Sequence, residues 1–287
     1  MIWKIRNTRL DLSRPRLMGI LNLTPDSFSD GGKFSAPEEV LQTALTMVQD
    51  GADILDLGAE STRPGALPVP AAEEMRRLLP VLKLLRPQIS VPISIDTTKL
   101  EVAGACLEAG ADIINDVSGG HDSGGRIASD CRDYGAGLVL MHRRGNPGTM
   151  QSLARYGDMI EEIRRELDES IRLALKNGAA ADQIVIDPGI GFAKTAEHSL
   201  EVIRRVEEFQ TLGYPILLGA SRKSFIGHVT GRETGEREFA HVAAAVYALM
   251  HGVSILRVHD VRGMRDVLKM FQAIQNAGAA EHEKTRT

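Results

Sequence analysis

A unit of helix, glycine, apolar strand and polar strand end recurs along the chain. Residues 51–58, 110–116, 135–142 and 252–259 each begin at a glycine, pass through a short apolar run and end on polar residues. Glycine tolerates the left-handed conformation that commonly ends a helix. A strand buried on both faces is typically a continuous apolar run. The pattern therefore predicts parallel strands alternating with helices.

Four more apolar segments, at residues 17–21, 91–96, 184–186 and 215–219, bring the predicted strands to eight. Eight such units predict an α/β fold, a (β/α)8 TIM barrel. The chain is expected to form one domain over residues 1–287, with the barrel at about 16–277. An open doubly wound sheet is the alternative, although no G-x-G-x-x-G motif follows the first strand. Amphipathic helices are expected between the strands, at about 37–50, 70–87, 98–109, 124–134, 156–177, 197–212, 236–251 and 262–277.

The two ends of the chain and one loop depart from this repeat. Residues 3–15 alternate between apolar and polar positions around Asn7-Thr8, which predicts a short β-hairpin across one end of the barrel. Residues 23–35 form a long polar loop, and such loops tend to be functional or disordered. The tail at residues 278–287 is expected to be frayed.

Composition and charge narrow the class of protein. Hydrophobic residues make up 43%, charged residues 25%, and the formal net charge is −4, so neither nucleic acid nor an anionic membrane is expected as a partner. The chain has no apolar run long enough to cross a bilayer and no signal peptide at its N-terminus. Cys106 and Cys131 fall in predicted helices and are interpreted as buried small residues. A cytoplasmic location is therefore expected.

Polar side chains follow the predicted strands where each strand ends. A lone Asp187 at the end of a strand could simply form a turn, but in a barrel all the strands end on one rim, which is the active face. A ring of polar residues from every strand therefore predicts a polar ligand site. Its members are Asn22, Glu60, Ser61, Thr62, Arg63, Asp96, Asn115, Asp116, Met141, His142, Asp187, Ser221, Arg222, Lys223, Arg257 and His259.

The residue types on this rim indicate one side suited to a heterocycle and another suited to an anion. Asp96, Asn115 and Asp187 suit a flat heterocycle with several N–H groups. Arg257 and His259 follow the last strand, where barrels commonly bind phosphate, and arginine pairs well with phosphate oxygens. The rim is thus predicted to be acidic on one side and basic on the other, with Lys223 suited to either. Structural roles are expected for His142 with a backbone partner, Arg143 and Arg144 as a solvated loop pair, and Asp53, Asp112 and Asp116 at strand edges or caps.

Eight segments at these strand ends together resemble the dihydropteroate synthase family, over residues from about 16 to 275. They are residues 19–32 (GILNLTPDSFSDGG), 60–65 (ESTRPG), 94–97 (SIDT), 115–119 (NDVSG), 141–142 (MH), 187–192 (DPGIGF), 221–227 (SRKSFIG) and 257–259 (RVH). Ala59 and Ala193 stand where the family more often has glycine, and residues 143–150 form a variant loop. None of these departures removes a ligand-binding side chain.

The resemblance implies a transferase of folate biosynthesis that sulfonamides inhibit. It would join 6-hydroxymethyl-7,8-dihydropterin diphosphate to 4-aminobenzoate and release 7,8-dihydropteroate and diphosphate. It implies Mg²⁺ bound through Asn22, a homodimer, and three sets of site residues. Pterin would contact Asp96, Asn115, Met141, Asp187, Phe192, Gly219 and Lys223; diphosphate would contact Asn22, Thr62, Arg63, Arg257 and His259; 4-aminobenzoate and the lid loops would involve Phe28, Asp30, Thr62, Pro64, Lys223 and Ser224.

Three other functions are compatible with parts of this pattern. A corrinoid-type methyltransferase barrel would also bind a pterin through Asp96, Asn115 and Asp187, but it needs no diphosphate clamp. A Schiff-base aldolase would use Lys223 as its nucleophile. A non-enzymatic pterin-binding relative would be expected to lose lid or clamp residues, which are present here.

Overall fold

The computed structural model of the chain describes residues 1–24, 37–63 and 65–277. Within them, an eight-stranded parallel sheet runs in the order β8-β7-β6-β5-β4-β3-β10-β9. A parallel bridge between Ile186 and Ile216 joins its two ends, so the sheet closes into a barrel and the doubly wound alternative is wrong. The strands are β3 (Arg16–Asn22), β4 (Ile54–Gly58), β5 (Ile93–Asp96), β6 (Ile113–Asp116), β7 (Gly137–Met141), β8 (Ile184–Asp187), β9 (Leu217–Leu218) and β10 (Ile255–Val258).

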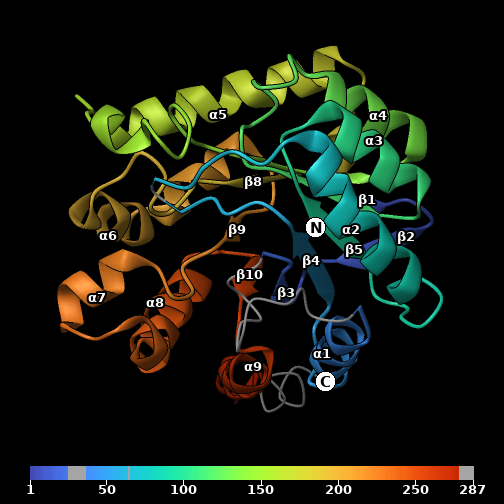
Figure 1. Cartoon of the computed structure of the whole chain (residues 1–287). Coiled ribbons are helices and arrows are strands. Elements are labelled where there is room, and N and C mark those ends of the chain that lie inside the picture. Colours follow the sequence, from blue (N-terminus) through green and yellow to red (C-terminus); the bar gives the residue numbers. More distant parts are fainter. Residues whose placement is uncertain (25–36, 64, 278–287) are drawn as a thin grey trace, which may run out of the picture.

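Helices surround the barrel on all sides (Figure 1). The helix predicted at 197–212 divides into α6 and a 3₁₀ helix at Val206–Leu212, and α7 was not predicted because it lies within a motif read as a loop. The helices are α1 (Pro37–Gln49), α2 (Ala71–Leu85), α3 (Leu100–Glu108), α4 (Arg126–Tyr134), α5 (Met159–Lys176), α6 (Ala196–Arg204), α7 (Ser224–Thr230), α8 (Glu238–Met250) and α9 (Val261–Asn276). No helix of the described residues is long and apolar enough to span a membrane.

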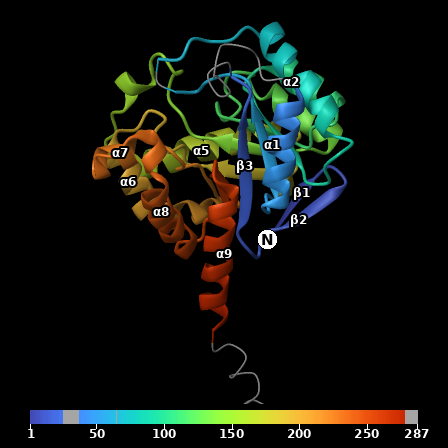
Figure 2. The same ribbon diagram turned by 60° about the horizontal axis from the view of Figure 1, so that its bottom comes forward.

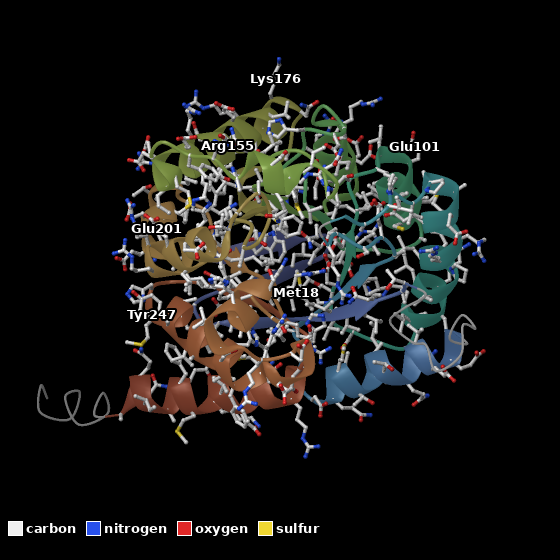
Figure 3. The ribbon with its side chains drawn as sticks, turned by 60° about the vertical axis from the view of Figure 1, so that its left-hand side comes forward. Met18, Glu101, Arg155, Lys176, Glu201 and Tyr247 are labelled. Atoms are coloured by element: carbon white, nitrogen blue, oxygen red, sulfur yellow. The ribbon has the colours of Figure 1, made fainter. Side chains whose placement is uncertain are left out.

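The side chains inside the barrel change from apolar to polar along the strands. Met18, Ile113 and Val185 pack together in the buried cluster at the N-terminal end, and Met18 lies at the centre of the view in Figure 3. Alternate residues of a strand point to opposite faces, so Asn115 and Asp187 face the same interior two positions later. The period of two thus places polar groups at the C-terminal end of the barrel.

The predicted hairpin closes the opposite end. It consists of β1 (Ile2–Ile5) and β2 (Thr8–Asp11), so its turn is at Arg6-Asn7, one residue earlier than predicted. Trp3 is fully buried, and its Nε1 donates to the carbonyl oxygen of Gln183 at 2.7 Å. A Cβ at Gly137, the first residue of β7, would lie 2.9 Å from the Trp3 ring. Figure 2 shows the hairpin at the end from which β3 starts.

Aspartates at the strand edges have the structural roles predicted for them. The carboxylate of Asp53 accepts from the backbone N–H of Leu17, and that of Asp112 accepts from Ile93, each at 2.9 Å. Asp116 accepts from the backbone N–H of Ser118 at 2.9 Å. These bonds fix the first residues of β3 and β5 and the turn after β6, without contributing to a ligand site.

Candidate active site

Arg257 joins two carboxylates inside the C-terminal end of the barrel. Its Nε donates to Asp56 Oδ2 at 2.6 Å, and its Nη2 donates to Asp96 Oδ2 at 2.8 Å. Asp56, which is fully buried on β4, also accepts from Asn115 Nδ2 at 3.2 Å. Charge-assisted bonds of this kind are short and strong. They hold Arg257, Asp96 and Asn115 in fixed relative positions.

This arrangement crosses the predicted division of the rim, because Arg257, expected on the basic side, is bonded to Asp96, expected on the acidic side. Arg257 starts on β10 but pairs with Asp56 on β4 and Asp96 on β5. The two sides therefore meet in one buried ion cluster. The physical reason is that the interior of an eight-stranded barrel is only wide enough for side chains to fill, so a long arginine reaches across it.

Within this cluster the pKa of the Asp96 carboxyl group lies close to neutral pH. Burial raises the pKa of Asp96 to about 7. The negative charges of Asp56 and Glu74 also raise this pKa, whereas the Arg257 guanidinium lowers it. Burial acts to lower the pKa of Arg257, but Asp56 and Asp96 together raise it, so the guanidinium stays charged. Asp96 can therefore accept or donate a hydrogen bond near neutral pH.

Asp187 ends β8 as predicted and is held by the turn that follows. Its Oδ1 accepts from the backbone N–H of Gly189 at 2.7 Å, while Oδ2 is left as an acceptor for a ligand. Burial raises the pKa of Asp187 to about 6, although Gly189 and Lys223 act to lower it. Gly189 has φ +72°, and a Cβ there would lie 2.0 Å from the carbonyl oxygen of His142. Glycine alone fits this turn.

An apolar wall and a lysine adjoin these carboxylates. Phe192 and Met141 are buried in one small cluster with Val117. The Lys223 Nζ lies 4.2 Å from the centre of the Phe192 ring, a cation–π distance. Burial and then Arg257 lower the pKa of Lys223 to about 8, against the opposing effect of the two site aspartates. A flat ring could pack on this wall with polar partners at its edge.

His259 and the ends of β3 and β4 line the other part of the rim. His259 Nδ1 lies 3.0 Å from Ser221 Oγ. Burial, and after it the neighbouring arginines, lower the pKa of His259 to about 3, so its ring is neutral. Asn22 ends β3 and is half-buried; on the loop after β4, Thr62 is half-buried and Arg63 is exposed. These groups could bind an anion.

The remaining predicted residues divide into two groups. Gly219 follows β9, and a Cβ there would lie 3.8 Å from the Cβ of Arg257, so it borders the same space. Ser224 is exposed as the first residue of α7. Three residues predicted for the lid loops lie outside the described residues, namely Phe28, Asp30 and Pro64.

Two structural interpretations near the rim are wrong. Arg143 and Arg144 do not form a solvated pair, because Arg143 is bound to Asp122 and Arg144 to Glu166. His142 binds side chains rather than a backbone group, with its Nε2 3.0 Å from Glu166 Oε2. Both errors arise because the partners lie far along the chain, on segments that only the barrel brings close.

Sequence reasoning did not identify Asp56 and Lys194 as buried charged residues of this region. Asp56 interrupts the apolar strand Ile-Leu-Asp-Leu-Gly at residues 54–58, and an acid within such a strand was a signal that it needs a buried partner. Lys194 is 3% exposed and follows the 187–192 motif, where nothing in the sequence distinguishes it from a surface lysine.

The chemistry available here is recognition and charge stabilisation. Among residues 1–24, 37–63 and 65–277, no group of three or more His, Cys, Asp or Glu side chains is placed to hold a metal ion. Carboxyl groups with raised pKa, an amide, a lysine and an apolar wall suit a heterocycle, while Arg257 and His259 suit an anion. One ligand with both features would be held across the rim.

Comparisons with known proteins identify the family of this chain. The family described as pterin binding enzyme matches residues 18–259. Dihydropteroate synthase from Synechocystis sp. is 46% identical over 262 residues, covering 91% of this chain and 90% of the relative. The structure of Yersinia pestis dihydropteroate synthase with a sulfonamide drug complex matches with a TM-score of 0.91 and 38% identity, over 96% of this chain and 100% of the other. The Thermus thermophilus enzyme in complex with 4-aminobenzoate matches with a TM-score of 0.84 and 45% identity, over 95% and 99%. The chain belongs to the dihydropteroate synthase family of pterin-binding enzymes.

Proposed function

We propose that this chain joins 6-hydroxymethyl-7,8-dihydropterin diphosphate to 4-aminobenzoate, releasing 7,8-dihydropteroate and diphosphate. The observation that carries the proposal is the meeting of Asp96, Asn115 and Asp187 with Arg257 and His259 at one end of the barrel. This combination suits a heterocycle that carries an anionic leaving group. The Thermus relative solved with 4-aminobenzoate supports the second substrate.

Asp187, Asn115 and Asp96 would bind the polar edge of the pterin. The free Oδ2 of Asp187 would accept from pterin N–H groups, since its Oδ1 is already bound to Gly189. Asn115 donates to Asp56, which leaves its carbonyl oxygen as an acceptor. Phe192 and Met141 would pack against the ring face, with Lys223 at the ring edge.

The reaction needs an arylamine nitrogen to attack the pterin methylene carbon as the carbon–oxygen bond to diphosphate breaks. The amine is neutral and nucleophilic, so alignment and stabilisation of the departing charge are sufficient. Arg257 and the neutral His259 would donate hydrogen bonds to the diphosphate, assisted by Thr62 and Arg63. The proton lost from the amine can leave to solvent after the new bond forms.

Mg²⁺ is proposed to bind with the diphosphate. Asn22 would offer one neutral oxygen from the end of β3, and a single protein ligand of this kind suits a magnesium ion, which retains several of its waters. The ion would neutralise charge on the leaving group.

An assay for diphosphate release tests the function directly. Release should require both the pterin diphosphate and 4-aminobenzoate, and a sulfonamide should compete with 4-aminobenzoate, as expected from the Yersinia relative solved with such a drug. Release from the pterin diphosphate alone at the same rate would contradict the proposed reaction. Turnover indifferent to millimolar sulfonamide would contradict the predicted inhibition.

Asn22→Ala is expected to raise the Mg²⁺ concentration for half-maximal turnover by about 10-fold or more. The variant loses the one oxygen proposed to hold the ion, whereas the pterin contacts stay intact. Turnover would be measured across a Mg²⁺ titration, with binding of 6-hydroxymethylpterin, which carries no diphosphate, as the control. An unchanged Mg²⁺ dependence would refute the role of Asn22.

We further propose that the chain forms a homodimer through α8 and works in the cytoplasm. On α8 the side chains of Phe239 and Met250 are 93% and 66% exposed, and Val229 near the end of α7 is 59% exposed. Apolar groups of this size on neighbouring helices suit a self-complementary interface. Phe239→Glu should convert a dimer into a monomer in sedimentation velocity; a monomeric native protein would refute the proposal.

The free, buried Cys106 and Cys131 agree with a reducing compartment.

A further inference from the structure

A buried polar network lies behind the wall formed by Phe192, and none of the steps proposed above uses it. Its centre is Lys194, which is 3% exposed and follows Phe192 by two positions. His142 after β7 and Glu166 on α5 complete it. A buried ammonium group is costly unless it is well paired. Burial accordingly lowers the pKa of Lys194 to about 7.

The hydrogen bonds of this network have a defined direction. Glu166 is ionised and can only accept, so the neutral ring of His142 carries its proton on Nε2, and its Nδ1 accepts from Lys194 Nζ at 2.8 Å. The Nε2 of the ring donates to Glu166 Oε2 at 3.0 Å. Burial and Lys194 lower the pKa of His142 to about 4, which agrees with a neutral ring. The chain of bonds ends on Glu166, whose pKa is lowered to about 2 by His142 and Arg144 although burial acts to raise it.

Side chains of this region hold three consecutive carbonyl groups of the loop between β8 and α6. Gln151 Nε2 donates to Gly191 O at 3.3 Å, Lys194 Nζ donates to Phe192 O at 3.1 Å, and the Tyr156 hydroxyl donates to Ala193 O at 3.0 Å. Ala193 has φ +49°, a left-handed conformation that costs energy for a residue other than glycine. The loop is therefore held in a strained shape by hydrogen bonds to its carbonyls.

The same loop borders the candidate site described above. It follows Asp187, the last residue of β8, continues through Gly189, and presents the Phe192 ring beneath the Lys223 ammonium. The backbone N–H of His142 donates to the carbonyl oxygen of Asp187 at 2.9 Å. This bond connects the network to Asp187, whose carboxylate is proposed to bind the pterin. A change at Lys194 would thus be transmitted to both the edge and the face of the bound ring.

We propose that Lys194 is a positioning residue for the pterin, one that fixes the Phe192 wall and the Asp187 edge without touching the ligand. The inference rests on the proposed function, because it assumes that the ring binds against Phe192. The hydrogen bonds of Lys194 are with His142 and the loop between β8 and α6, which borders the pterin side of the site. The 4-aminobenzoate side, built from other loops, should be independent of it.

Lys194→Met is the decisive variant, because methionine fills the same space without donating to His142 or Phe192. We expect the Kd for 6-hydroxymethylpterin and the KM for the pterin diphosphate to rise roughly 10-fold or more, from the loss of two buried bonds. The KM for 4-aminobenzoate should change by less than about 2-fold, within the range of neutral substitutions. Lys269→Met makes the same chemical change on an exposed side chain of α9 and should alter neither constant.

A merely structural role predicts a different result, namely a lower thermal midpoint with parallel changes in both KM values. That result, or an unchanged pterin Kd, would overturn the inference. Should Lys194→Met fail to fold, Tyr156→Phe removes only the hydroxyl bonded to Ala193 O, and it should weaken pterin binding in the same direction by a smaller factor. Pterin binding is measured without 4-aminobenzoate, so failure of the native protein to turn over would count against the proposed function and not against Lys194.

Discussion

Arg257→Ala is expected to abolish turnover and also to lower the free energy of unfolding by about 3–5 kcal/mol, the usual effect of breaking a buried ion pair. The guanidinium is the partner of both Asp56, which is fully buried, and Asp96. A residue that only clamped diphosphate would leave binding of an unphosphorylated pterin intact. The ion cluster predicts instead that this binding weakens too, because Asp96 would lose the charge that favours its ionised form.

Diphosphate release and urea unfolding measure the two parts of this prediction. Arg257→Lys is the matched control: it retains the charge but cannot bond both carboxylates with one planar group, so it should lose activity with less loss of stability. The cluster would be refuted if Arg257→Ala unfolded at the native urea midpoint and bound 6-hydroxymethylpterin as tightly as the native protein does.

Asp187→Asn is expected to abolish detectable pterin binding while making the unliganded protein more stable at neutral pH. Burial raises the pKa of Asp187 from 3.8 to about 6, so ionisation works against the fold. A raised carboxyl pKa contributes stability that is fully present below pH 3.8 and is lost as the pH rises through about 6. Asparagine keeps an acceptor for Gly189 and has no charge, so it should add about 1–3 kcal/mol at pH 8, since one pKa unit corresponds to about 1.4 kcal/mol.

Urea unfolding at pH 4 and pH 8, together with calorimetric pterin binding, checks this prediction. The stability gain should be present at pH 8 and nearly absent at pH 4, where the native carboxyl group is also protonated. Asp182→Asn makes the same change at an exposed position and should affect neither property. A destabilised Asp187→Asn protein at pH 8 would show that Asp187 serves the fold, contrary to its proposed role in recognition.

The pattern of local positions was sufficient to predict the barrel. Glycines such as Gly51 and Gly252 end helices in left-handed conformations, with φ of +102° and +89°, and the apolar runs after them are buried strands. These are properties of short segments, so they can be read without knowing the rest of the chain. The positions of Asp187 and Asn115 at the ends of their strands followed in the same way.

The sequence by itself therefore determined the alternation of parallel strands with helices, the strand ends at which the polar residues lie and, through its motifs, the family; the bridge between Ile186 and Ile216 showed that the sheet closes. Only the tertiary structure decided how those residues pair. Arg257 binds Asp56 across 201 positions of the chain, and Lys194 binds His142 across 52. The physical reason is that helices and strands follow from short-range periodicity, whereas a buried charge is satisfied by whichever group the closed barrel brings within bonding distance.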